Sequence, residues 1–121
     1  MTALYARHPA TTIALVRHGQ VHNPEGIVYG RRPRFRLSAL GRRQAAGAAR
    51  ALDGWPLALI CTSPLLRARQ TAQALLEKRG GLRLQVSRLI HEVRTPFEGL
   101  PLTEARARGE DAYTEIGRAH V

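Results

Sequence analysis

The sequence predicts an α/β fold, a three-layer sandwich with a mainly parallel sheet. Three observations lead to this class. Short runs of aliphatic residues without polar alternation are typical of strands buried on both faces. Longer segments with apolar residues at helical spacing lie between these runs. The resulting order of strand, helix, strand, helix and strand is that of right-handed βαβ units. At 121 residues, the chain is long enough for one domain with its own core.

The first strand is predicted over residues 12–17, an apolar run that ends abruptly in polar residues. Arg17 and His18 would stand at its carboxyl end, where ligands bind in open α/β sheets. Gly19 would then allow a sharp turn and a close approach of a ligand to the backbone. Residues 1–11, which precede the strand, are expected to be a leader outside the domain.

A long connection over residues 20–37 and a helix over 39–52 follow. The connection carries four arginines between residues 31 and 36, and loops of this length in compact domains are usually functional. Its position directly after the Arg-His turn indicates a pocket wall. Ser38 is the expected N-cap of the helix.

The second strand is predicted over residues 57–61 and the second helix from Ser63 to about Arg79. Ser63 would be the N-cap and Pro64 the first helical residue. A third strand is expected over 82–86 and a further helix over 103–108. Because adjacent parallel strands end at one sheet edge, Arg17 and His18 should meet Ser63 and Arg67 there. Two guanidiniums near a helix N-terminus would bind a phosphate dianion, and a neutral imidazole could attack its phosphorus.

Composition and charge indicate which classes of binding partner to expect. The formal net charge is +10, yet the cations are scattered and nearly all arginine, with Lys78 the single lysine. This pattern favours a solvated, compositionally biased surface over a nucleic-acid-binding face. No apolar stretch is long enough to cross a bilayer. Cys61 is the single cysteine, so no intramolecular disulfide can form, and we expect a cytoplasmic protein without a membrane or nucleic-acid partner. No metal-ligand spacing is present, and no cofactor is expected.

The chain resembles the histidine phosphatase superfamily, the phosphoglycerate mutase-like proteins, over about residues 12–100. An ordered set of motifs carries the resemblance. The matching stretches are Leu15-Val16-Arg17-His18-Gly19, Tyr29-Gly30-Arg31, residues 37–45, residues 62–72, Leu89-Ile90-His91-Glu92 and Phe97-Glu98-Gly99.

The resemblance implies a role for each matching residue. His18 would be the nucleophile that becomes phosphohistidine, and Arg17 and Arg67 would hold the phosphoryl oxygens. Glu92 would protonate the leaving alkoxide and then activate water. The same resemblance places further residues at the substrate, namely Gly19, Asn23, Tyr29, Gly30, Arg31 and Ser63.

The sequence also departs from the family pattern. Val21 stands where the family usually has Thr or Ser, and Asn23 is one residue closer to the Arg-His motif than is common. The family carries a second His-Gly on a later strand, for which His120, followed by Val, is a poor match. We therefore expect an N-terminal portion of a longer enzyme, with a truncated domain over 12–114. Residues 115–121 are expected to be non-native, because residues 116–121 match a reading frame of a common DNA-sequencing adapter and Glu115 would lie at the junction.

The predicted function is a phosphomonoesterase that acts through phosphohistidine on a small phosphorylated metabolite. A phosphoglycerate mutase-type phosphoryl transfer is the nearest alternative. A fragment that binds phosphate without turnover is the non-enzymatic alternative. The substrate and the oligomeric state do not follow from the sequence.

Overall fold

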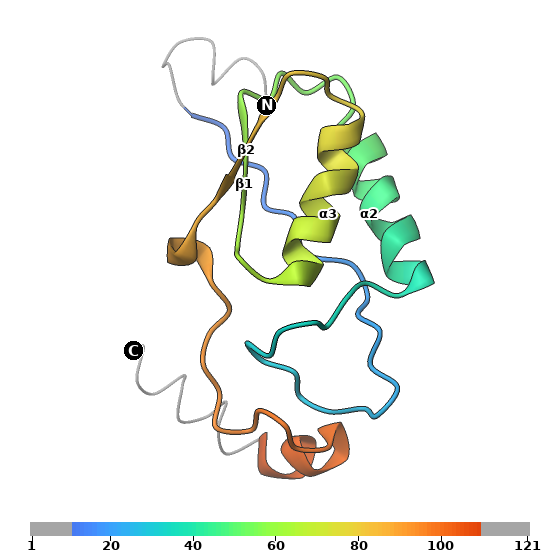
Figure 1. The fold of residues 1–121 in the computed structure, drawn as a ribbon, viewed down its shortest axis with the longest axis vertical. Helices are drawn as coiled ribbons and strands as arrows, with labels where there is room; N and C mark the ends of the chain where they lie inside the picture. The colour runs from blue at the N-terminus through green and yellow to red at the C-terminus, as the bar shows by residue number, and fades with distance from the viewer. Residues whose placement is uncertain (1–10, 110–121) are drawn as a thin grey trace.

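The computed structural model describes residues 11–109, which form two strands, two long helices and connecting loops (Figure 1). The elements follow the order α2, β1, α3, β2 and the short 3-10 helix η1. Residues 102–109 are also helical, as predicted for 103–108. The bounds are Ala39–Ala51 for α2, Leu59–Thr62 for β1, Leu66–Glu77 for α3, Arg83–Val86 for β2 and Arg88–Ile90 for η1.

The predicted α/β class with a parallel sheet is confirmed. Strands β1 and β2 pair in parallel, with Leu59 opposite Arg83 and Thr62 opposite Val86. Helix α3 forms the crossover between them, which is the βαβ unit that the sequence predicts. Because β1 and β2 run in the same direction, both finish at the end of the fold where α3 begins (Figure 1).

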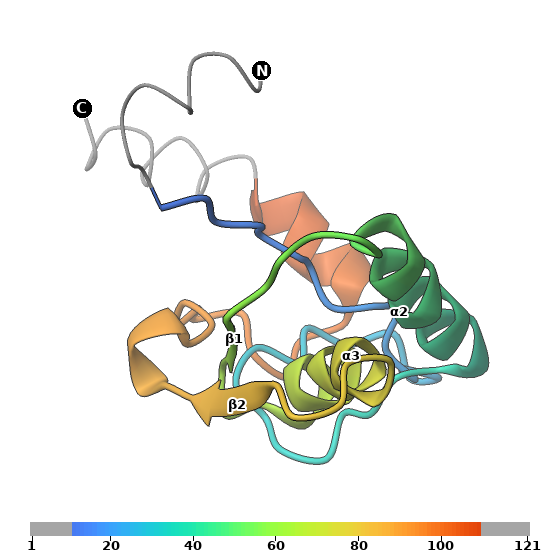
Figure 2. The ribbon, with the colours of Figure 1, turned by 90° about the horizontal axis from the view of Figure 1, so that it is seen from above.

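The core lies where α3 packs between the sheet and α2 (Figure 2). Small side chains allow the two helices to approach each other closely, and Ala49 of α2 and Ala72 of α3 are both buried. Ile60 of β1 and Leu75 of α3 complete the buried cluster. Strand β1 is covered on one face only, because Ile60 and Thr62 are buried while the alternate residues are exposed. The expectation of a strand buried on both faces is therefore wrong for β1 within the described residues.

The two long helices begin differently. Ser38 caps α2 as predicted, since its Oγ accepts a hydrogen bond from the Gly41 amide at 3.0 Å. The predicted cap of the other helix is wrong. Helix α3 begins at Leu66 after an extended Leu65, without a side-chain cap, so Ser63 and Pro64 lie before the helix.

The predicted first strand over residues 12–17 is also wrong. The segment is irregular and exposed, with relative exposures of 74% for Ile13 and 94% for Leu15. A strand needs a partner for its backbone hydrogen bonds, and β1 and β2 pair only with each other among the described residues. The chain gains such partners only beyond the run, where the Gly19 amide donates to Thr71 and the Gln20 amide to Gln44.

The long connection over 20–37 is tied down at several points. Single β-bridges join Val21 to Leu37 and Ile27 to Pro101. In Figure 1 this connection and the segment over 91–101 lie together at the end of the fold where β1 and β2 finish. The connection is therefore positioned as a wall beside the carboxyl end of the sheet, which is where the sequence predicts the site.

Three sequence predictions concern parts of the chain that the structure covers little or not at all. The leader over 1–11 is described only at residue 11, and the proposed tail over 115–121 lies outside the described residues. The second His-Gly candidate, His120, lies outside them too. In the part of the chain that is described, no helix has both the length and the apolar character needed to span a membrane.

Candidate active site

Arg67 is the centre of the candidate site. It lies in the first turn of α3 and is only 1% exposed, which makes it the largest fully buried side chain of the described residues. Its Nη2 donates to the Gly30 carbonyl at 2.5 Å and lies 3.9 Å from the Glu92 carboxylate. Its guanidinium carbon is 4.5 Å from the centroid of the Tyr29 ring. We call Tyr29, Gly30, Arg67 and Glu92 the Arg67 cluster.

The environment of Arg67 leaves part of the guanidinium without a partner. Burial lowers the pKa of Arg67, and the nearby Tyr29 and Glu92 oppose this shift. An arginine nevertheless stays charged in a protein. Its buried Nε has no hydrogen-bond partner among the described residues. A buried cation with an unused donor is costly unless an anion completes it, so the cluster is suited to an anion that accepts from this nitrogen.

The Tyr29–Arg31 segment reaches α3 because the backbone turns sharply there. Gly30 has a positive φ of 48°, a conformation that favours glycine. A Cβ at this position would also collide with the Glu98 carboxylate. Arg31 fixes the segment further, because its amide donates to Glu98 at 2.5 Å and its Nε donates to the Glu92 carbonyl at 2.5 Å. The loop and the Glu92 segment therefore form one connected wall around Arg67.

His18 lies next to this cluster and contacts its aromatic ring. Its imidazole is edge-on to Tyr29, with 6.4 Å between the ring centroids. The Nδ1 atom lies 2.7 Å from the Gly19 carbonyl, so it acts as the donor in this contact. In the neutral form of the imidazole, this tautomer leaves the lone pair on the other ring nitrogen, Nε2. Tyr29 thus contacts both the imidazole of His18 and the guanidinium of Arg67.

Thr71 anchors the His18 segment to the helix that carries Arg67. Its buried hydroxyl accepts from the Gly19 amide at 3.2 Å and donates to the Arg67 carbonyl at 2.9 Å. The sequence analysis missed this residue. A threonine four residues after Arg67, on the same buried face of the helix as Ala72 and Leu75, is the signal that could have found it.

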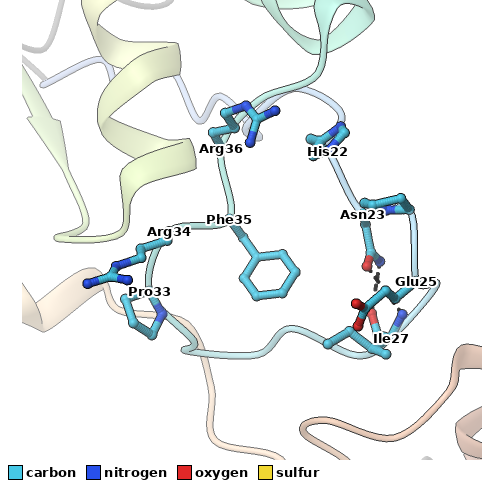
Figure 3. Close-up of a pocket in the computed structure, with 9 residues that line it drawn as sticks. His22, Asn23, Glu25, Ile27, Pro33, Arg34, Phe35 and Arg36 are labelled. Carbon is cyan, nitrogen blue, oxygen red and sulfur yellow. Dashed lines mark hydrogen bonds between the residues drawn. The ribbon is translucent and has the colours of Figure 1, made fainter.

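Three of the predicted site residues are not brought to Arg67 by any described contact. Arg17 is exposed, and no hydrogen bond or ion pair holds its side chain within residues 11–109. Ser63 is buried, and its carbonyl accepts from the Thr62 hydroxyl. Asn23 uses both ends of its amide within its own loop, donating to the Ile27 carbonyl at 2.9 Å and accepting from the Ile27 amide at 3.2 Å (Figure 3).

His91 is a further polar group beside the cluster. Sequence analysis alone treats it only as a neighbour of Glu92. Its Nδ1 is buried and has no hydrogen-bond partner among the described residues. Burial lowers the pKa of His91, the cations Arg31, Arg94 and Arg67 lower it further, and Glu92 opposes them.

A hollow of about 230 Å³ lies inside the long connection, and we call it the loop pocket (Figure 3). Phe35 projects into it and packs on Tyr29, with 5.4 Å between the ring centroids. Tyr29 of the Arg67 cluster is therefore in contact with Phe35, which lines the loop pocket. Its lining residues are His22, Asn23, Pro24, Glu25, Ile27, Pro33, Arg34, Phe35 and Arg36.

Metal-ligating side chains are not clustered in the part of the chain that the structure describes. No three His, Cys, Asp or Glu residues lie close enough together there to hold a metal ion. The chemical groups of the candidate site are therefore an imidazole, a buried guanidinium, a phenol ring and a carboxylate.

Comparison with known proteins gives a consistent set of relatives. The family model described as "Histidine phosphatase superfamily (branch 1)" matches residues 13–120. An uncharacterized protein of Mycobacterium tuberculosis, Rv0525, is 45% identical over 89 residues, which are 74% of this chain and 44% of that protein. Fructose-2,6-bisphosphatase TIGAR of Mus musculus is 33% identical over 112 residues, covering 88% of this chain and 42% of that protein.

A solved structure gives the same result for the fold. The mycobacterial glucosyl-3-phosphoglycerate phosphatase Rv2419c, in a complex with VO3, superimposes with a TM-score of 0.67 at 33% identity. The superposition covers 81% of this chain and 49% of that one. The chain therefore spans about half the length of the proteins that it matches.

Proposed function

We propose that this chain, which belongs to the histidine phosphatase superfamily, carries the phosphoryl-transfer site of a phosphomonoesterase. The observation that carries the proposal is the buried guanidinium of Arg67, whose Nε lacks a partner among the described residues, together with His18, whose imidazole contacts the same Tyr29 ring as Arg67 does. A phosphoryl group that accepts from this Nε would satisfy the buried charge and lie beside the imidazole. Two relatives support a small metabolite as the substrate, because their names describe phosphatases of fructose 2,6-bisphosphate and of glucosyl-3-phosphoglycerate.

In the proposed first step, Nε2 of His18 attacks phosphorus, and the bond between phosphorus and the ester oxygen breaks. The contact between Nδ1 and the Gly19 carbonyl orients the imidazole for this attack. Arg67 stabilises the charge on the transferring oxygens. Arg17, exposed and adjacent to His18, is the proposed second guanidinium. Glu92 donates a proton to the leaving oxygen, so the alcohol departs as a neutral product.

In the second step, Glu92 takes a proton from water while the water oxygen attacks the phosphorus of phosphohistidine. The bond between phosphorus and nitrogen breaks, inorganic phosphate leaves, and His18 returns to its starting form. The position of the Glu92 carboxylate beside Arg67 supports this role, because it lies 3.9 Å from a guanidinium that would hold the phosphate. Gly19, Asn23, Tyr29, Gly30, Arg31 and Ser63 remain proposed substrate-binding residues.

The proposal is tested by trapping the phosphoenzyme. The chain is incubated with radiolabelled 3-phosphoglycerate and quenched in alkali, and the protein-bound label is then tested for stability in acid. We expect an acid-labile label that His18→Ala abolishes, and His22→Ala serves as the matched control that keeps it. Label that is stable in acid, or that persists in His18→Ala, would exclude the phosphohistidine mechanism.

The same incubation separates the alternatives. Release of inorganic phosphate indicates a phosphatase, whereas conversion of 3-phosphoglycerate to its isomer indicates the mutase-type transfer. Binding of phosphate that Arg67→Gln removes, without any label on His18, would identify a phosphate-binding chain without turnover.

A further inference from the structure

Glu98 belongs to a motif of the resemblance that has no part in the proposed mechanism. The motif, Phe97-Glu98-Gly99, lies in the segment that runs beside the long connection (Figure 1). Backbone hydrogen bonds fix it there, because the Gly99 amide donates to the Val28 carbonyl at 2.8 Å and the Val28 amide donates to the Leu100 carbonyl at 2.8 Å. Glu98 is therefore held beside the loop segment that contacts the buried guanidinium.

The peptide group between Gly30 and Arg31 connects Glu98 to Arg67. Its carbonyl oxygen, that of Gly30, accepts from Nη2 of Arg67 at 2.5 Å. Its N–H, that of Arg31, donates to Oε1 of Glu98 at 2.5 Å. The described residues contain no cis peptide bond, and the C=O and N–H groups of a trans peptide point in opposite directions. The guanidinium and the carboxylate therefore bind opposite edges of one peptide group.

The charges at the two edges favour the observed orientation of this peptide group. A flipped peptide would direct its N–H toward Arg67, which has only donors, and its carbonyl oxygen toward the ionised Glu98, which has only acceptors. The backbone would otherwise allow such a flip easily, because Gly30 has no side chain and tolerates either sign of φ. The Gly30 carbonyl is the one hydrogen-bond acceptor of the Arg67 guanidinium within residues 11–109. Glu98 therefore opposes the orientation in which Arg67 would lose that acceptor.

The placement of the Glu98 side chain fits this role. A Cβ at Gly30 would overlap the Glu98 carboxylate, so the carboxylate lies directly against this residue. The side chain is exposed, and no ion pair engages it in the part of the chain that the structure describes. The Arg31 amide is the partner that its carboxylate binds.

We infer that Glu98 is a positioning residue, which holds the Arg67 guanidinium in place through the Gly30–Arg31 peptide group. This inference rests on the proposed function, because the phosphoryl group bound by Arg67 is what a displaced guanidinium would lose. The two carboxylates near the site then have different tasks. Glu92 exchanges protons with the substrate and with water, whereas Glu98 orients the backbone that binds the arginine.

The test measures the affinity of the full chain for inorganic phosphate by isothermal titration calorimetry. Glu98→Ala removes the acceptor of the Arg31 amide, and we expect it to weaken phosphate binding about fivefold. Loss of a negative charge alone would strengthen the binding of an anion, so the expected weakening is opposite in sign to a simple charge effect.

Two further variants assign the effect to the contact with the peptide group. Glu98→Gln keeps a side-chain oxygen that can accept from the Arg31 amide, and it should bind phosphate within about twofold of the wild type. Glu104→Ala is the matched control, because it removes an exposed carboxylate that binds the Arg108 side chain and no backbone amide. It should not weaken phosphate binding.

Hydrogen exchange followed by NMR reports on the peptide group directly. The Arg31 amide should exchange about tenfold faster in Glu98→Ala than in the wild type, and Glu98→Gln should restore most of its protection. The amides of Val28 and Gly99 are the internal reference, because they donate to backbone carbonyls of the same paired segments. They should keep their protection in every variant. An equal loss of protection at all three amides would mean that Glu98 only stabilises the segment, and it would overturn the inference.

The remaining outcomes separate this inference from the proposed function. Wild-type phosphate affinity in Glu98→Ala, equal weakening by Glu98→Ala and Glu98→Gln, or a similar weakening in Glu104→Ala would overturn the positioning role and leave the phosphoryl site standing. If the wild-type chain binds no phosphate while the protection of the Arg31 amide depends on Glu98 as expected, the proposed function is overturned. The hold of Glu98 on the peptide group that binds Arg67 is then supported.

Discussion

Two apolar runs in this chain look alike in sequence and differ completely in structure. Residues 12–17 and 57–61 are both aliphatic, and each leads into residues proposed for the site. The second run gives strand β1, in which Ile60 is 7% exposed. The first run is irregular, and Leu15 is 94% exposed. The difference arises from their neighbours, because β1 pairs with β2 and packs against α3.

The comparison shows that the site does not depend on the first run being a strand. His18 is held from the side that follows the run, where the Gly19 amide donates to Thr71 of α3. Arg67 is one helical turn earlier on the same helix. The packed unit of β1 and α3 therefore positions both the guanidinium and, through Gly19, the imidazole.

The largest expected effect is the difference in stability between core and surface truncations in the two apolar runs. Ile60→Ala should lower the free energy of unfolding by about 2–4 kcal/mol, because it leaves a cavity in the cluster with Ala49, Ala72 and Leu75. Leu15→Ala should change it by less than about 0.5 kcal/mol, because the side chain is already in solvent. Urea unfolding followed by circular dichroism measures both. A similar loss in the two variants would mean that the first run is buried in solution.

The parts of the fold that could be predicted are those set by neighbouring residues. The Ser38 cap depends on its own side chain and an amide three residues later, and it is present. The first strand depended on a partner strand, which no local pattern specifies. The predicted Ser63 cap is wrong because the helix begins only at Leu66, after Leu65 in an extended conformation.

The same distinction applies to the site. The motif around Arg67 identified the buried guanidinium. The guanidinium contacts Tyr29 and Gly30, however, which precede Arg67 in the chain by 38 and 37 positions. Such long-range contacts follow from the fold and not from spacing. The predicted role of Asn23 at the phosphate stays a prediction, and among the described residues its short polar side chain binds the backbone four residues later, as asparagine commonly does in loops.

The next effect concerns the segment after the first run, where the chain packs against α2. Gly41 of α2 lies against the backbone of Gln20, and a Cβ there would overlap the Gln20 carbonyl. Gly41→Ala should therefore cost about 1–3 kcal/mol of stability and loosen the segment that carries His18.

Gly47→Ala is the matched control on the same helix. A Cβ there meets only the flexible end of Arg50 at 3.7 Å, so this variant should gain up to about 1 kcal/mol from helix propensity. Thermal unfolding measures both variants. Equal stabilisation by the two changes would contradict the close contact at Gly41.

A smaller effect separates the helices that follow the two runs. Ser38→Ala should cost about 1 kcal/mol, because it removes the side-chain acceptor of the Gly41 amide. Ser63→Ala should lack this cost, since Ser63 caps no helix. Urea unfolding measures the loss of stability in the two variants. A loss of the full capping energy in Ser63→Ala would mean that α3 begins earlier in solution.

The smallest effect concerns the pH dependence of the segment that covers Arg67. The pKa of His91 in the folded chain is lowered from its ordinary value of 6.5 by burial and by the cations Arg31, Arg94 and Arg67. The unfolded chain therefore binds a proton more readily than the folded chain does. The stability that depends on neutral His91 is fully present above the ordinary pKa of the unfolded chain. It is lost as the pH falls through the lowered pKa of the folded chain.

His91→Gln should accordingly flatten the decline in stability between about pH 8 and pH 5. Arg94→Gln should weaken the decline only in part, because burial and the other two cations still oppose the charged imidazole. Urea midpoints across this range measure both variants. If His91→Gln kept the wild-type decline, the buried Nδ1 would have found a partner in solution, and the packed wall around Arg67 would be more polar than the described contacts indicate. If the decline flattens, the imidazole is held neutral in that wall, and the contrast with the exposed first run extends to the electrostatics of the site.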